Sequence, residues 1–322
     1  MQHMPPNTGS APSRLSVVPA IPDEGIIDRI GNTPLLRLHL FDQDAPDVAV
    51  YAKAEFLNPG GSVKDRPALR MIEEAERSGE LTHDRTIIDS TSGNTGIAYA
   101  MIGAAKGYHV RLVMPGNVSA ERRELVTAYG GEIVYSDPME GSDGAIRLVH
   151  AMYEADPDAF FLPNQYDNDN NWRAHYDGTG REIWEQTHGT ITHFVAALGT
   201  SGTFVGVSRR MHELNRDVRC ISVQPSEPWH GLEGLKHMAT SIVPRIYDAS
   251  LADENIDVDT EPAYELARVL ASSEGILAGH SSGAALVAVR EVAQRIGRGV
   301  IVTVLADGGA RYVSTGLYGR RA

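Results

Sequence analysis

The chain has 322 residues, of which 42% are hydrophobic, enough for one large folded domain or two of moderate size. Its 42 acidic residues outnumber its 29 basic ones, and the resulting net charge of −13 favours neither a nucleic acid nor an anionic membrane as a partner. The single cysteine, Cys220, excludes an intrachain disulfide framework and is typical of the reducing cytoplasm, and no apolar run has membrane-spanning length.

Residues 1–24 form a segment rich in Pro, Ser and Asn. They lack a basic region followed by an apolar block, which is the pattern of a signal peptide. We therefore expect a flexible leader ahead of the folded part of the chain.

From residue 25 onward, predicted strands alternate with predicted helices. In the first set, a cation and a glycine at Lys106-Gly107 end one helix, and Ser119 is expected to cap the next, which ends at Gly130-Gly131. The strands of this set are expected at 48–55, 86–89, 110–114, 133–135 and 160–162, with a further helix at 142–156.

The second set begins with a predicted helix at 169–187. The strand at 218–223 contains Cys220, which we interpret as a buried packing residue. The strand segments are apolar without alternation, as is typical of parallel strands covered on both faces. The pattern predicts an α/β fold, with two doubly wound lobes and a cleft between them. The other elements of this set are strands at 193–198 and 300–305 and helices at 202–215, 261–274 and 282–296.

One lysine, Lys64, stands out because it follows a glycine turn and precedes an amphipathic helical pattern. Most lysines are solvated surface residues, and for Lys64 alone that interpretation would be preferred. A lysine held rigidly at the start of a helix can instead lose its hydration. Its amine pKa then falls, and it can form a Schiff base with a carbonyl compound.

Two glycine-rich turns indicate sites for anions. Ser90 to Gly96 places hydroxyls, an amide and backbone N–H groups at a helix N-terminus, which suits a carboxylate. Gly199 to Thr203 follows a predicted strand and opens a helix, which suits a phosphate. The second turn lacks the Gly-Lys-Ser/Thr of a Walker A loop and the spacing of a dinucleotide-binding loop.

A third turn, Gly279 to Gly283, matches the G-x-S-x-G pattern of α/β-hydrolases. That fold needs a histidine after its serine, but His280 is the last histidine of the chain and precedes Ser281. The serine-hydrolase interpretation is therefore rejected. No metal site is expected, because the histidines lack a ligand pattern and there is no cysteine cluster.

Taken together, the motifs resemble the cysteine synthase family of pyridoxal-phosphate enzymes of fold type II, the O-acetylserine and O-phosphoserine sulfhydrylases. This family is related to the catalytic core of cystathionine β-synthase. The resemblance covers about residues 25–318 and implies pyridoxal 5′-phosphate as the cofactor, bound in the cleft between two α/β lobes. The matching blocks, in the family's order, are Gly31–Leu35, Asn58–Arg66, Ser92–Gly96, Gly199–Thr203, Gly279–Ala284 and Gly309–Thr315.

The resemblance also implies roles for individual residues. Lys64 matches the lysine that forms the Schiff base and later moves the Cα proton. Asn94 matches the asparagine that binds the cofactor's 3′-oxygen, and Ser281 matches the serine that faces the pyridine nitrogen. The phosphate loop corresponds to Gly199, Thr200, Ser201, Gly202 and Thr203, and the substrate-carboxylate site to Thr91, Ser92, Asn94, Thr95 and Gln165.

The family's organisation implies three parts of the chain. Residues 1–24 would be the leader, 25–56 with 166–322 the larger lobe that binds the cofactor phosphate, and 57–165 a smaller, mobile lobe that binds the substrate. A cytoplasmic homodimer is expected from the same resemblance, with a small amino-acid substrate, and neither a nucleic acid nor a membrane as a partner.

The implied reaction is β-replacement on an O-activated L-serine through an aminoacrylate intermediate. L-Cysteine would form from O-acetyl- or O-phospho-L-serine, with sulfide or a thiocarboxylated carrier protein as sulfur donor. Because Ser281 is neutral, the ring nitrogen is expected to stay largely unprotonated, which favours β-elimination over transamination.

The chain departs from the family pattern at His280 and Ala310, and His280 either alters the pocket near the cofactor ring or serves packing alone. Lys236 stands near the place of an arginine found in members that accept O-phosphoserine or bulkier sulfur donors. It either pairs with a phosphate leaving group or is a solvated surface lysine.

Other functions remain open at this stage. A cystathionine β-synthase core using serine and homocysteine fits the string around Lys64 equally well, and an amine nucleophile would give another β-replacement. A pseudoenzyme that only binds a partner is disfavoured, because Lys64, Asn94, the phosphate loop and Ser281 are all present.

Overall fold

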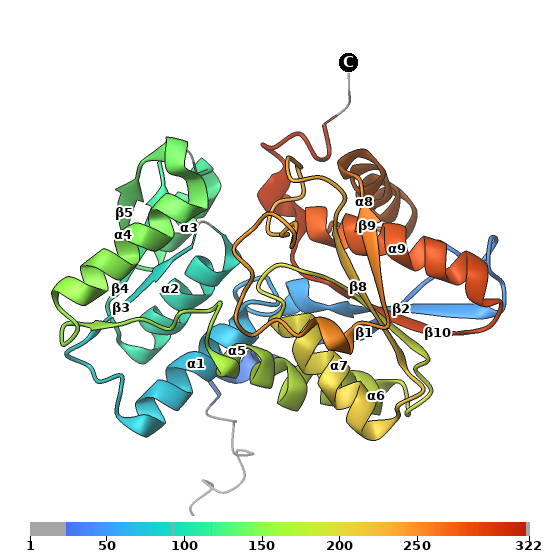
Figure 1. The fold of residues 1–322 in the computed structure, drawn as a ribbon, viewed down its shortest axis with the longest axis horizontal. Coiled ribbons are helices and arrows are strands. Elements are labelled where there is room, and N and C mark those ends of the chain that lie inside the picture. The colour runs from blue at the N-terminus through green and yellow to red at the C-terminus, as the bar shows by residue number, and fades with distance from the viewer. Residues whose placement is uncertain (1–23, 92, 117, 320–322) are drawn as a thin grey trace, which may run out of the picture.

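The computed structural model describes residues 24–319 except 92 and 117. The predicted leader therefore lies outside the described residues apart from Glu24. Two α/β lobes lie side by side, each built on its own sheet (Figure 1). Within the described ranges, no helix is long and apolar enough to cross a membrane.

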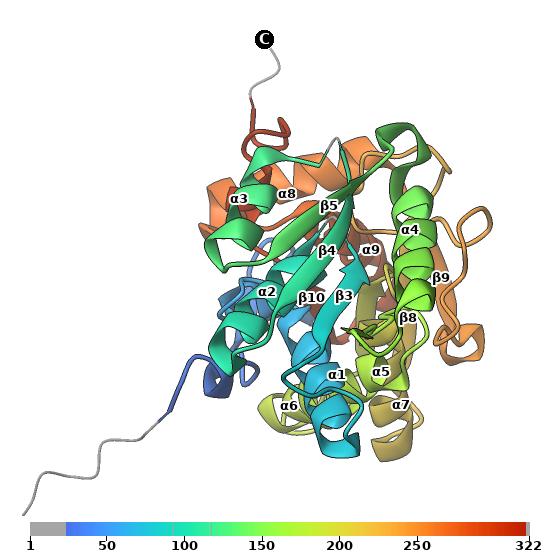
Figure 2. The same cartoon turned by 90° about the vertical axis from the view of Figure 1, so that its left-hand side faces the viewer.

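The small lobe contains a four-stranded parallel sheet in the order β5-β4-β3-β6. One apolar core joins α1, α2 and α3 to one face of the sheet, and a second core joins α4 to the other. Figure 2 shows this lobe from its outer side. Its strands are β3 (Thr86–Ser90), β4 (Val110–Pro115), β5 (Glu132–Ser136) and β6 (Phe160–Phe161), and its helices are α1 (Asp65–Ser78), α2 (Asn94–Lys106), α3 (Ala120–Ala128) and α4 (Gly141–Ala155).

The large lobe contains a six-stranded sheet in the order β1-β2-β10-β7-β8-β9, parallel except for the antiparallel pairing of β1 with β2. Helices α8 and α9 pack on one face, and α7 packs on the other. The strands are β1 (Leu35–Leu38), β2 (Val48–Ala54), β7 (His193–Ala197), β8 (Arg219–Pro225), β9 (Glu254–Val258) and β10 (Gly299–Leu305). The helices are α5 (Asp169–Ala174), η4 (His175–Gly180), α6 (Arg181–Gln186), α7 (Gly202–Leu214), α8 (Thr260–Glu274) and α9 (His280–Ile296).

Five short 3-10 helices connect these elements. They are η1 (Ile27–Arg29), η2 (Glu55–Leu57), η3 (Pro138–Glu140), η5 (Ala249–Leu251) and η6 (Gly309–Tyr312).

The α/β prediction is confirmed, and the long apolar strands and most helices lie where the sequence placed them. Gly107 ends α2 with a φ of 79°, as the cation-glycine pattern predicted. Ser119 is the N-cap residue of α3, as predicted, but its side chain makes no capping hydrogen bond. Strands β1 and β9 were not predicted, because both are short and carry polar residues within them.

A buried cluster of four charged side chains ties the first turn of α1 to the large lobe. The Arg66 guanidinium donates to both oxygens of Glu55 and both oxygens of Glu182, at 2.6–2.7 Å. Lys53 Nζ pairs with Glu182 at 2.6 Å. With two cations and two anions the cluster is electrically balanced, which offsets the cost of burying each charge.

The pKa values of the two acids reflect this pairing. Burial alone would raise the pKa of Glu182, but Arg66 and Lys53 together hold it at about 2. Burial opposes ionisation of Glu55 in the same way, and Arg66 holds its pKa below the usual value. Both groups are therefore carboxylates at neutral pH, and Arg66, two residues after Lys64, is fixed in position.

Replacing Arg66 with Met is expected to lower the free energy of unfolding by about 3–5 kcal/mol, because two buried carboxylates lose their cation. Urea unfolding followed by circular dichroism measures the change. Arg181→Met is the control, because Arg181 pairs with Glu185 in the open and should barely move the midpoint. Equal midpoints for the two variants would contradict a stabilising role for the cluster.

Candidate active site

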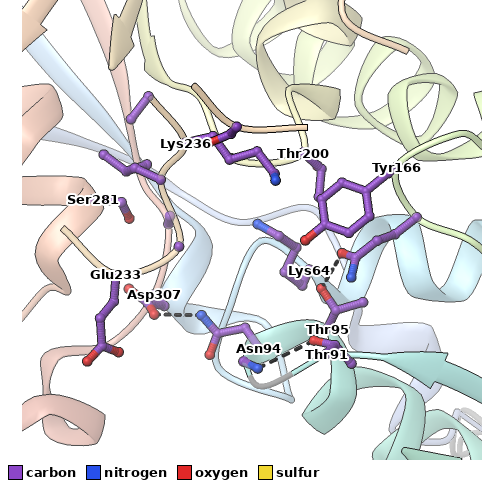
Figure 3. Close-up of a pocket in the computed structure, with 18 of the residues that line it drawn as sticks. Lys64, Thr91, Asn94, Thr95, Tyr166, Thr200, Glu233, Lys236, Ser281 and Asp307 are labelled. Carbon is purple, nitrogen blue, oxygen red and sulfur yellow. Dashed lines mark hydrogen bonds between the residues drawn. The ribbon is translucent and has the colours of Figure 1, made fainter. Parts of the chain in front are cut away.

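A cavity of about 990 Å³ lies between the lobes, where the carboxyl ends of strands from both sheets meet. Ser90 and Pro115 end strands of the small lobe, and Ala197 and Ala306 lie at strand ends of the large lobe. This is where open α/β sheets place their ligands. The predicted site residues that line the cavity are Lys64, Thr91, Asn94, Thr95, Gln165, Gly199, Thr200, Thr203, Lys236 and Ser281. Several of them point toward its centre (Figure 3).

Two other predicted residues do not line the cavity, and a third is not described. Ser201 and Gly202 are buried and do not line the cavity. Ser92 lies outside the described residues.

Lys64 is positioned by a loop that bonds to the end of β10. Ser62 forms a bridge with Asp307, and Val63 N–H donates to Ala306 O at 2.7 Å. The turn needs glycine at two places: a Cβ on Gly60 would overlap the Asp65 carboxylate, and Gly61 has a φ of 78°. These backbone contacts fix the chain immediately before Lys64 against the end of β10.

The Lys64 amine lies in a poorly solvated position. Burial lowers its pKa from the ordinary value, and the carboxylates of Asp307 and Glu55 partly oppose that shift. Desolvation disfavours the charged form of an amine, so the fraction of free base at neutral pH increases. A free-base amine is the form that attacks a carbonyl and accepts a proton.

The turn between β3 and α2 faces the cavity with Thr91, Asn94 and Thr95. Thr95 Oγ1 donates to Gln165 Oε1 at 2.8 Å, which joins this turn to the segment that follows β6. Because α2 has 13 residues, its N-terminal N–H groups and dipole add to these hydroxyls. The arrangement suits a carboxylate.

The turn between β7 and α7 is compact. Ser201 has a φ of 69°, and a Cβ on Gly202 would overlap the Asn171 amide, so the chain comes close to α5. Asn171 Nδ2 donates to Thr200 Oγ1 at 3.2 Å. Ser201 Oγ is buried without a partner among the described residues. An unpaired hydroxyl and the N-terminus of a 13-residue helix fit a phosphate group.

His175 supports the same turn and was not predicted. Its Nε2 forms a hydrogen bond with Thr203 Oγ1 at 3.3 Å, and its Nδ1 forms one with Thr179 Oγ1 at 2.9 Å. Burial, with the charge of Arg66, lowers the pKa of His175 to about 3, so the ring is neutral. His175 begins a π-helical turn, which breaks the single helix expected at 169–187. Nothing in its sequence spacing indicated this contact.

Ser281 lies in the first turn of α9 and lines the cavity, whereas the neighbouring His280 does not. The His280 ring is 1% exposed and packs 4.8 Å from the Tyr264 ring and 4.4 Å from the Tyr312 ring. Of the two interpretations offered for His280, the structure supports packing.

Asp307 is a second residue that the motif comparison missed. It lines the cavity beyond the end of β10, and its Oδ2 accepts hydrogen bonds from Asn94 Nδ2 at 2.6 Å and from the Tyr312 hydroxyl at 2.5 Å. A lone aspartate after an apolar strand is a common sequence feature, so only its neighbours in space identify it.

Lys236 also points into the cavity, with Nζ 4.9 Å from the centre of the Tyr166 ring (Figure 3). Burial lowers the pKa of Lys236, while the Asp143 carboxylate opposes the shift. Lys236 is thus partly shielded from water in the cavity wall.

These residues fit pyridoxal phosphate. Lys64 would hold the aldehyde carbon, the Thr200–Thr203 turn the phosphate, Asn94 the 3′-oxygen and Ser281 the ring nitrogen. The unpaired Ser201 hydroxyl and the buried amine of Lys64 agree with an anion and a carbonyl group at those two places.

One group of potential metal ligands lies elsewhere in the described chain. The ligand atoms of His212, Cys220 and Asp253 are within 4.8 Å of one another, but none of these residues lines the cavity. Asp253 already accepts from the Cys220 N–H and pairs with Arg219. The group has no connection to the candidate active site.

Known proteins that are similar to this chain agree with a pyridoxal-phosphate site. Residues 26–307 match the family model described as pyridoxal-phosphate dependent enzyme. The chain is 49% identical to cysteine synthase of Aquifex aeolicus, over 92% of each chain. It is 45% identical to cysteine synthase B of Escherichia coli, over 90% of this chain and 94% of the other. A crystal structure of cysteine synthase from Entamoeba histolytica superposes with a TM-score of 0.89 at 34% identity, covering 99% of this chain and 95% of that one.

The rate at which the apoprotein captures pyridoxal phosphate should rise at a lower pH than it would for a lysine with the ordinary pKa of 10.5. Only the free amine attacks the carbonyl, so a lowered pKa moves the rise in rate to lower pH. Stopped-flow absorbance across neutral and alkaline pH measures the profile, with Lys64→Arg as the blank and N-acetyl-lysine as the solvated reference. A midpoint equal to that of the reference would contradict a desolvated Lys64.

Proposed function

The chain belongs to the pyridoxal-phosphate dependent enzyme family, and we propose that within it the protein is a cysteine synthase that makes L-cysteine from O-acetyl-L-serine and sulfide. The observation that carries the proposal is the meeting of three features in one cavity. These are the half-buried, desolvated Lys64 amine, the carboxylate-binding turn at Thr91–Thr95 and the phosphate-binding turn at Gly199–Thr203. Both named relatives span nearly the whole chain.

The protein's own residues then have distinct tasks. When bound, the cofactor supplies the electron sink that makes the substrate Cα–H bond acidic. The α2 N-terminus, with Thr91 and Thr95, binds the substrate carboxylate and orients that bond toward Lys64. Lys64 Nζ accepts the Cα proton, the Cβ–O bond breaks and acetate leaves. Sulfide forms the Cβ–S bond, and Lys64 returns a proton to Cα.

Ser281 contributes by being neutral. A carboxylate beside the ring nitrogen would keep it protonated and strengthen the electron sink. A hydroxyl leaves the nitrogen largely unprotonated, and this limits the side reactions that need a long-lived carbanion. The first turn of α9 places Ser281 at the cavity wall, which supports this role.

The direct test is an assay for cysteine formation from O-acetyl-L-serine and sulfide, with Lys64→Ala as the matched variant. The wild type should turn over, and the variant should lose nearly all activity and the absorbance of the lysine-bound cofactor, because no other proton acceptor replaces the amine. Turnover of serine with homocysteine but not of O-acetylserine with sulfide would refute the proposal in favour of the cystathionine β-synthase alternative.

We also propose that the protein accepts a second substrate, O-phospho-L-serine, and that Lys236 binds its phosphate leaving group. Its ammonium group lies in the cavity wall together with Thr200 and Tyr166, where it is partly shielded from water. A shielded cation forms a stronger pair with a phosphate ester than an exposed one does. An acetyl ester carries no charge for Lys236 to pair with.

Lys236→Met should therefore lower kcat/KM for O-phosphoserine by about tenfold or more, the worth of one charge-assisted hydrogen bond. The same substitution should change kcat/KM for O-acetylserine by less than about threefold, because the side-chain shape is kept. Lys236→Arg is the control that retains the charge. An equal loss with both esters would remove Lys236 from leaving-group recognition.

Three further features of the proposal rest on resemblance. Residues 57–165 would move as the smaller lobe when the substrate binds, and the protein would act as a homodimer in the cytoplasm. A thiocarboxylated carrier protein is the alternative sulfur donor. The single cysteine, Cys220, is buried in β8, which agrees with a reducing compartment.

A further inference from the structure

Asp307 carries the strongest unexplained feature of the cavity. Its side chain is 1% exposed, and a buried carboxylate is costly unless donors satisfy it. Both of its donors, Asn94 Nδ2 and the Tyr312 hydroxyl, reach the same oxygen, Oδ2. The other oxygen, Oδ1, has no partner among the described residues and lies against Gly279, where a Cβ would overlap it.

The hydrogen bonds of Asn94 fix which way its amide points. A carboxylate only accepts and a guanidinium only donates, so the amide nitrogen must face Asp307 and the amide oxygen must face Arg311. An amide nitrogen has two hydrogens, and Asp307 takes one of them. Because the group is planar, the direction of the second hydrogen is then determined, and Asn94 lines the cavity.

We propose that Asp307 is a positioning residue that acts through Asn94, directing the second amide hydrogen to the 3′-oxygen of the cofactor. The inference rests on the proposed cofactor chemistry and adds a residue to it. The charge on Asp307 matters as well as its shape, since a charge-assisted acceptor polarises the amide and strengthens its remaining N–H as a donor.

Asp307 also joins the two lobes. Its side chain bonds to Asn94 at the start of α2 in the small lobe, while its backbone forms the bridge with Ser62, two residues before Lys64. Arg311, from the same C-terminal segment, donates to Asn94 Oδ1 and to Gly60 O. Asn94, whose bond to Asp307 is drawn in Figure 3, and the loop that carries Lys64 are thus both held against one short stretch of the large lobe.

Tyr312 holds Asp307 in turn. Its hydroxyl donates to Oδ2, and its ring packs against His280 on one side and lies 5.7 Å from the Arg122 guanidinium. His280 and Tyr312 therefore belong to a packed support behind Asp307. This support gives the unusual His280 a structural purpose at a distance from the cavity.

The test compares two substitutions of Asp307 in the full-length holoenzyme. Asp307→Asn keeps an oxygen that accepts from Asn94 but removes the charge, and Asp307→Ala removes the acceptor. The readouts are the dissociation constant for pyridoxal phosphate and the ratio of the bound cofactor's two absorption bands, which responds to hydrogen bonding at the 3′-oxygen. We expect Asp307→Ala to raise the dissociation constant by about tenfold and Asp307→Asn by less, with the band ratio shifting in the same order.

Two tyrosine variants provide a matched pair on the same segment. Tyr312→Phe removes the hydroxyl that donates to Asp307 and should shift the band ratio in the same direction as Asp307→Asn. Tyr318→Phe removes another partly buried hydroxyl, whose hydrogen bonds within the described part of the chain go to the Ala278 backbone, and should leave the ratio as in the wild type.

An unchanged band ratio and a dissociation constant within about twofold of wild type for Asp307→Asn and Tyr312→Phe would overturn the proposal. Equal shifts for Tyr312→Phe and Tyr318→Phe would also overturn it, since they would reflect loosening of the whole segment. Failure of the proposed function looks different, because the wild type would then form no cysteine from O-acetyl-L-serine and sulfide, whatever the band ratios of the Asp307 and Tyr312 variants. If Asp307→Ala does not fold, the asparagine and phenylalanine variants still decide the matter.

Discussion

The arrangement of the cavity depends on two buried ion pairs, which the Arg66 guanidinium forms with Glu55 and Glu182. Arg66 belongs to the first turn of α1 in the small lobe, whereas Glu55 follows β2 and Glu182 lies in α6. The cluster therefore joins elements that are far apart in the sequence. Because Lys64 immediately precedes α1, the same ion pairs that join the lobes also fix the helix start next to Lys64. A displaced Arg66 would leave buried carboxylates unpaired, so the geometry is strongly selected.

The chemistry of the cavity follows from what surrounds this fixed point. Two turns at the N-termini of α2 and α7 supply sites for anions. Burial lowers the pKa of Lys64, so more of its amine is the free base at neutral pH, the form that accepts a proton or attacks a carbonyl. The cavity is polar because its walls are strand ends and helix starts, where backbone groups lack partners within their own elements. Under the proposed roles, the phosphate, the aldehyde and the ring nitrogen of the cofactor would each face a group that suits it.

Much of this was predictable from local sequence. Apolar segments such as 110–114 and 300–305 gave strands, and glycine motifs marked the turns that needed close approach of the backbone. The residues that escaped prediction act through space. His175 reaches Thr203 only because a π-helical turn brings it there, and Asp307 reaches Asn94 only when the lobes are assembled. Strands β1 and β9 pair at the edges of the large sheet, where short polar segments carry little periodic signal.

The sequence by itself determined the α/β class, the positions of the strand-to-helix turns and the choice of Lys64 as the candidate Schiff-base lysine, because each depends on residues close together in the chain. Only the tertiary structure decided which side chains face one another across the cavity. It placed Lys236 beside Tyr166, assigned His280 to packing, and brought Asp307 to Asn94. The physical reason is that burial and hydrogen-bond pairing are properties of the assembled lobes, and contacts between segments that are distant in sequence leave no local pattern to read.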